Sequence, residues 1–280
     1  MRNSSRMKSG SASLLSSLAG SIFSLLLLVC GAGCAADQAA QQSLDAGFTS
    51  IANAPQNDEL TDALTRADAQ LAKEPAGKNT ARALYLRGRA LEQRVKKSPA
   101  QATADFGAAR QAYVDALQQS PGTPLEYYIR SSLANICYWQ DDYTTAQQQW
   151  AACAGKFDDD TVNSFVQYRI GLCQQRLGNF IAADQTFATV QEKFQVVEVA
   201  QRAKAHTGFR FFTVQLATFA NAQTADAAVA QLLRENVNPK RITDPRGTHV
   251  VTIGPCPNYA QAQQLKARFI ARYPDAVIVP

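Results

Sequence analysis

The sequence has few of the residues from which metal centres and active sites are usually built. It has two histidines, His206 and His249, and its six cysteines include no C-x2-C pair. Structural zinc sites need closely spaced cysteine or histidine ligands, so a zinc site is not expected. We also find no nucleophile with a base and no facing carboxylates of the kind that hydrolases use. We therefore predict no catalytic residue, no metal and no cofactor, and a chain that is not an enzyme.

A large excess of positive charge is also missing. The formal net charge is +5 over 280 residues, and three of the cations lie in the first eight positions. Without residues 1–33 the net charge falls to +2. Nucleic-acid binding needs a dense basic surface to neutralise phosphates, so we expect no nucleic-acid partner.

The amino terminus has the pattern of an export signal. Basic residues precede an apolar run at 21–30 that is too short for a comfortable membrane span. The segment Gly31-Ala32-Gly33-Cys34 resembles a bacterial lipobox, which implies lipidation of Cys34 and a membrane contact through that lipid anchor. Ala35 after the cysteine favours the periplasmic side of the outer membrane. Ordinary cleavage after Ala36 is the alternative.

Between the signal and the carboxy-terminal region we expect two segments. Residues 34–57 are rich in Ala, Gln, Asp and Asn, which predicts a flexible tether. Residues 58–206 are predicted to be helical, beginning with Leu60, Leu64, Ala67 and Leu71 on one helix face.

The helical segment contains an internal repeat. Ala109, Ala146 and Ala183 follow one another at a constant interval of 37 residues, and each is followed four positions later by an aromatic residue. These aromatic residues are Tyr113, Trp150 and Phe187. The pattern resembles tetratricopeptide repeats, although an insertion near Lys96-Lys97-Ser98-Pro99 lengthens the first unit. Small residues allow close helix packing and the aromatics fill the core, so we predict an all-α solenoid whose groove binds a protein partner.

Residues 207–280 have a different pattern, typical of a small α+β domain. Strand-like and helix-like periodicities alternate in the order βαββαβ. The expected strands are 211–219, 240–243, 249–253 and 276–279, and the expected helices follow Thr224 and Asn258. We expect Gly254-Pro255 to end the third strand. Two helices can cover only one face of a four-stranded antiparallel sheet, so the other face is available to a ligand.

Two strand motifs in this region resemble those of the SPOR domain family. They are Val214-Gln215-Leu216-Ala217-Thr218-Phe219 and Val251-Thr252-Ile253-Gly254-Pro255. The resemblance implies binding to bacterial cell-wall glycan strands from which the stem peptides have been removed, chiefly at the division septum.

The resemblance also implies a site on the open sheet face. Gln215 matches the first-strand glutamine of the family, and Thr218 keeps the hydroxyl of its serine. Val250 stands where several members have an arginine, and Thr248 stands where they have an aromatic residue. Together with Thr252 and Val277, these positions form the expected glycan platform. On pattern alone, Gln215 and Thr218 could equally be ordinary residues of a solvated strand face.

The sequence therefore predicts a cell-envelope adaptor that binds glycan through one domain and a protein through the other. One alternative is a protein-protein scaffold whose SPOR-like domain no longer binds glycan. Another is an enzyme or accessory of wall hydrolysis.

Export would permit a disulfide among Cys137, Cys153 and Cys173, but these residues and Cys256 could equally be small core residues.

Overall fold

The computed structural model describes residues 35–52, 57–245 and 247–280. The expected signal sequence and the lipidation position Cys34 lie outside the described residues. The chain divides into two compact units, one up to Asp141 and the other from Asp142 to Pro280.

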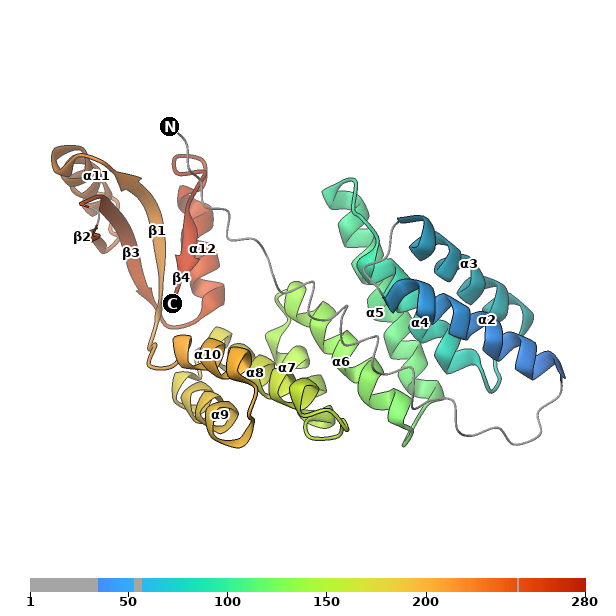
Figure 1. Ribbon diagram of the computed structural model, residues 1–280. Coiled ribbons are helices and arrows are strands. Elements are labelled where there is room, and N and C mark those ends of the chain that lie inside the picture. The colour runs from blue at the N-terminus through green and yellow to red at the C-terminus, as the bar shows by residue number, and fades with distance from the viewer. Residues whose placement is uncertain (1–34, 53–56, 246) are drawn as a thin grey trace. The chain divides into compact units, whose positions relative to one another are not determined.

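The first unit is helical (Figure 1). Its helices are α2 (Ala35–Ala52), α3 (Asn57–Lys73), α4 (Thr80–Gln93), α5 (Pro99–Gln119) and α6 (Pro124–Trp139). Neighbouring helices along the chain pack against each other. The inserted residues of the first repeat do not form a long loop: α5 has 21 residues, whereas α7 of the second unit has 11. The insertion is thus taken up largely by a longer helix.

The prediction of a flexible tether was wrong for the described part of that segment. Ala35–Ala52 forms helix α2, in which Leu44 is fully buried and Ile51 is 3% exposed. Leu44, Phe48 and Ile51 share one helix face and pack with Leu86 in the same apolar cluster. The polar composition concealed this apolar stripe, whose burial stabilises the helix.

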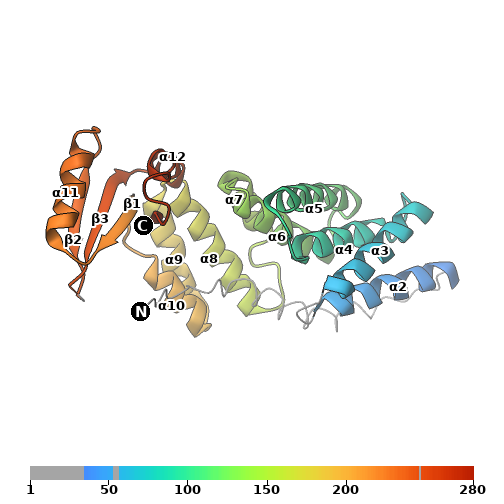
Figure 2. The ribbon, with the colours of Figure 1, turned by 90° about the horizontal axis from the view of Figure 1, so that it is seen from above.

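The second unit begins with four helices, which both views show next to one another (Figures 1 and 2). They are α7 (Tyr143–Cys153), α8 (Asp160–Arg176), α9 (Phe180–Lys193) and α10 (Val197–Ala205). Asp142 caps α7 by accepting a hydrogen bond from the Thr145 backbone N, and Asp159 caps α8 in the same way from Thr161. Each of these two helices therefore begins at a run of acidic residues, Asp141-Asp142 for α7 and Asp158-Asp159-Asp160 for α8.

The repeated small and aromatic residues are core residues, as predicted. Tyr113 and Phe187 are fully buried and Trp150 is 2% exposed. A Cβ atom added at Gly171 would lie 2.5 Å from the Phe187 ring, and one added at Gly88 would lie 2.4 Å from the Tyr113 ring. The same glycine–aromatic contact thus occurs in both units, where the absent side chain allows two helices to approach closely.

The sheet of the second unit contains β1 (Phe212–Phe219), β2 (Pro239–Thr243), β3 (His249–Cys256) and β4 (Val277–Val279). The strand order is β2-β3-β1-β4, and the three pairings are antiparallel. Helices α11 (Ala222–Leu233) and α12 (Tyr259–Phe269) complete the predicted βαββαβ order. Asn258 caps α12 as expected, whereas α11 is capped by Asn221 rather than Thr224.

Strand β3 does not end at Gly254-Pro255 as expected. It continues to Cys256, and the register with β1 shifts between Phe212 and Val214. The two residues form a bulge in β3. Gly254 has a φ of 138°, and an added Cβ would lie 3.2 Å from the Phe212 carbonyl oxygen. Glycine is required here both by the backbone angle and by the close approach to β1.

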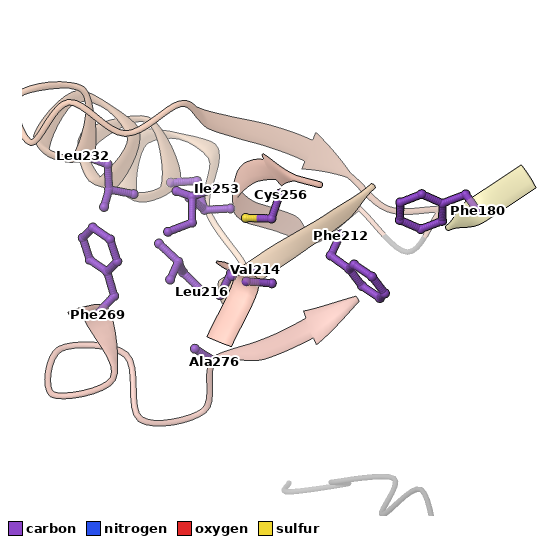
Figure 3. Close-up of a cluster of buried hydrophobic side chains, with 12 residues drawn as sticks. Phe180, Phe212, Val214, Leu216, Leu232, Ile253, Cys256, Phe269 and Ala276 are labelled. Carbon is purple, nitrogen blue, oxygen red and sulfur yellow. The ribbon is translucent and has the colours of Figure 1, made fainter. Parts of the chain in front are cut away.

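The helices α8 and α9 contact the sheet domain directly. Phe180, the first residue of α9, is 7% exposed and belongs to the same apolar cluster as Val214, Leu216 and Phe269 (Figure 3). Its ring centroid lies 5.7 Å from that of Phe212. The core of the sheet domain therefore includes a residue from the preceding helices.

A second contact with the sheet domain is polar and aromatic, and it comes from α7 and α8. The Arg176 guanidinium lies 3.6 Å from the centre of the Tyr259 ring, and Tyr143 meets the same ring edge-on at 5.8 Å.

None of the helices within the described residues is long and apolar enough to span a membrane.

Candidate binding face of the sheet

One face of the sheet is covered by the two helices that follow β1 and β3. Helix α11 contacts β1, β2 and β3, and α12 contacts β1, β3 and β4. Val214, Leu216, Val251 and Ile253 point into the core that these helices close (Figure 3 labels three of the four). Side chains alternate along a strand, so the residues between the core positions point to the opposite face.

Gln215 and Thr218 both lie on that opposite face because β1 contains a bulge. Gln215 pairs with Thr252, but Ala217 pairs with the very next residue of β3, Val251. The extra residue on β1 restores Thr218 to the face of Gln215, which strict alternation would not do. Gln215 Nε2 lies 3.5 Å from Thr218 Oγ1, at the long limit of a hydrogen bond.

The register places the predicted residues in two rows across the sheet. One row contains Thr252, Gln215 and Val277 on β3, β1 and β4. The other contains Val250 and Thr218 on β3 and β1. Val277 is 45% exposed, whereas Thr252 is only 7% exposed and offers little contact area. Five of the six expected positions thus share one face.

Thr248, the sixth expected position, precedes β3 and closes the hairpin that joins β2 to β3. Its backbone N donates to Asp244 Oδ1 at 3.0 Å, and its carbonyl oxygen accepts from the Asp244 N at 2.8 Å. Its hydroxyl oxygen is buried and has no hydrogen-bond partner among the described residues. The contacts seen for Thr248 are therefore those of a turn residue.

Two residues of β2 extend the face and were missed at the sequence level. Lys240 pairs with Thr252, and Ile242 pairs with Val250. Ile242 is 54% exposed and Lys240 is also exposed. Between them, Arg241 points the other way and forms an ion pair with Asp226 of α11 at 2.9 Å. The alternation of β2 could have been read from the sequence, but its register with β3 could not.

The chemistry of the face suits a ligand rich in hydroxyl groups. It presents an amide from Gln215, a hydroxyl from Thr218, and the apolar side chains of Ile242, Val250 and Val277. Amides and hydroxyls can both donate and accept hydrogen bonds, and apolar side chains can contact the faces of sugar rings.

The described residues contain no group of three or more metal-ligating side chains. Cys256, on β3, is 5% exposed, and burial raises the pKa of its thiol. The other cysteines among the described residues, Cys137, Cys153 and Cys173, are also buried thiols. In Cys256 the neutral thiol is favoured, which suits a small core residue better than a nucleophile.

Comparison with known families identifies the carboxy-terminal region. Residues 208–280 match the SPOR domain, so the segment that forms this sheet and its two helices is a SPOR domain. SPOR domains are binding domains, and the match implies a peptidoglycan-binding function connected with cell division. The same match points to a protein of the cell envelope. No curated protein and no solved structure matches the chain.

Proposed function

We propose that the protein is an exported, lipid-anchored adaptor of the cell envelope. Its SPOR domain binds peptidoglycan glycan strands, and its helical repeats bind a protein partner, in division or wall remodelling. The glycan occupies the open sheet face defined by Gln215, Thr218, Val250, Thr252 and Val277, with Thr248 at its margin. In this proposal Cys34 carries the lipid, on the periplasmic side of the outer membrane.

The observation that carries this proposal is the common orientation of Gln215 and Thr218. A bulge is needed to bring the two side chains to one face, and that face is the one that α11 and α12 leave uncovered. The same bulge turns Phe219 toward the core, so the bulge by itself does not require a ligand. The proposal is supported by its other effect, which is to place the amide of Gln215 and the hydroxyl of Thr218 together on the uncovered face.

The tetratricopeptide-like assignment is part of the proposal. It is supported by the recurrence of one packing arrangement, in which Gly88 faces Tyr113 and Gly171 faces Phe187. Stacked helix pairs of this kind present an extended surface that suits a peptide or a partner helix. The proposed domain limits remain 34–57, 58–206 and 207–280, with the first of these now including helix α2.

The glycan part can be tested by sedimentation of residues 35–280 with purified cell-wall sacculi, either untreated or treated with an amidase that removes stem peptides. We expect the protein to sediment preferentially with treated sacculi. Gln215→Ala removes one or two hydrogen bonds, and we expect it to weaken retention about fivefold to tenfold. Gln231→Ala, on the exposed side of α11, is the matched control and should behave as the unmodified chain.

Equal retention of the Gln215→Ala variant would contradict the proposed face. Absence of any retention would instead favour the scaffold alternative, in which the domain contacts only protein. Release of soluble wall fragments by the protein would favour the alternative of a wall enzyme.

A further inference from the structure

The open face of the sheet carries a single charged side chain among its strand positions. This is Lys240, which sits on β2 directly beside Thr252 and therefore in the same row as Gln215. The other strand residues of the face are threonine, glutamine, valine or isoleucine. The face thus combines one positive charge with neutral hydrogen-bonding and apolar groups.

Lys240 is exposed, and the acidic residues of α11 and of the turn that follows it are paired with arginines. Asp226 pairs with Arg241 on the helix side of the sheet, and Glu235 forms a two-pronged ion pair with Arg272 at 2.7 and 2.8 Å. Within the part of the chain that the structure describes, no ion pair involves Lys240. An unpaired ammonium beside hydroxyl and amide groups favours an anionic ligand.

The sugar chain of the proposed ligand exists in two forms, which differ in charge at the lactyl group. Where a stem peptide is attached, the lactyl group of the sugar ends in a neutral amide. Hydrolysis of that amide breaks the C–N bond, adds water, and leaves a carboxylate on the sugar and an ammonium on the released peptide. Removal of each peptide therefore creates one negative charge on the glycan strand itself.

We propose that Lys240 binds the lactyl carboxylate of peptide-free glycan and so distinguishes stripped from peptide-bearing strands. This inference rests on the proposed function, since it assigns one ligand group within the proposed face. The aligned row places Lys240 on one side of Thr252 and Gln215 on the other. A sugar unit lying across the row contacts the amide of Gln215 while its acidic substituent meets Lys240.

The experiment uses soluble peptide-free glycan oligomers and residues 35–280, with affinity measured by titration calorimetry. A second sample of the same oligomers has its carboxylates converted to methylamides. The variants are Lys240→Gln, Lys240→Arg and Lys266→Gln. Lys266→Gln makes the same change of charge on α12, which covers the opposite face of the sheet, and it serves as the matched control.

We expect methylamide capping to weaken binding of the unmodified chain about twofold to fivefold, the range for a solvent-exposed ion pair. Lys240→Gln should lose the same factor for the carboxylate oligomers and bind both samples equally. Lys240→Arg and Lys266→Gln should keep the preference. Raising the salt concentration should reduce the preference of the unmodified chain, because exposed charge pairs are screened.

The outcomes separate the two proposals. Equal binding of both oligomers by the unmodified chain would overturn the role of Lys240 while leaving glycan binding intact. Loss of the preference in Lys266→Gln as well would also overturn it, because net charge alone would then explain the effect. Failure of the unmodified chain to bind either sample would refute the proposed function, and the inference with it.

Discussion

Replacing Phe180 with alanine tests whether the SPOR domain depends on the helices that precede it. Phe180 begins α9, yet its ring lies within the core of the sheet domain, 5.7 Å from the ring of Phe212. The remaining members of that core come from the sheet, its helices and their connections. The substitution therefore removes an apolar contact between α9 and the domain without changing any residue of the domain itself.

The expected cost follows from burial. Phe180 is 7% exposed, and truncation of a buried phenylalanine to alanine lowers the free energy of unfolding by about 3–5 kcal/mol. Because Phe180 lies at a helix end where neighbours can adjust, we expect about 3 kcal/mol. That is a large fraction of the 5–15 kcal/mol typical of a folded domain. Ile181, the next residue, is 70% exposed, and Ile181→Ala should cost less than about 0.5 kcal/mol.

The assay is urea unfolding of residues 35–280, combined with amide hydrogen exchange of strand β1. In Phe180→Ala we expect faster exchange at Val214 and Leu216, because their strand loses part of its supporting core. In Ile181→Ala the exchange of these amides should be unchanged. A loss below about 1 kcal/mol in Phe180→Ala, or unchanged exchange in β1, would show that the domain folds independently of α9.

Two further predictions concern pH and lipidation. Burial and, second, the charge of Arg176 lower the pKa of His206, so the folded state binds this proton less readily than the unfolded state. The stabilisation from neutral His206 is complete above its ordinary pKa of about 6.5 and is lost as the pH falls below it. Unfolding measured from pH 7.5 to 5.5 should therefore show a decline that His206→Gln reduces; an identical decline in both proteins would contradict this cause. For the anchor, a cell supplied with labelled palmitate should label the full chain but not Cys34→Ser, and equal labelling of the two would exclude Cys34.

Much of the sheet domain could be predicted because its sequence carries local signals. β1 alternates polar and apolar residues, and Asn258 stands at the position of a helix cap. The buried Tyr113, Trp150 and Phe187 could likewise be found from a repeat period that only a regular array would keep.

Other features depend on information that one strand or helix does not contain. The bulge at Leu216–Ala217 is defined by pairing with β3, and Lys240 enters the candidate face only through the register of β2. The contact of Phe180 with Phe212 joins residues from different parts of the chain, and nothing in either segment indicates the other. Helix α2 is a different case, because the spacing of Leu44, Phe48 and Ile51 was available and was obscured by the polar residues between them.

Helix α2 changes how far an anchored molecule can extend from its membrane. A helix rises about 1.5 Å per residue, whereas an extended chain covers about 3.3–3.6 Å per residue. The 18 residues of α2 therefore span about 27 Å, compared with about 60 Å for the same residues fully stretched. In the anchored form proposed above, the folded array begins immediately after the lipid-bearing cysteine. Access to the wall is then governed by folded structure in this segment, and a longer reach would require α2 to unfold and expose Leu44.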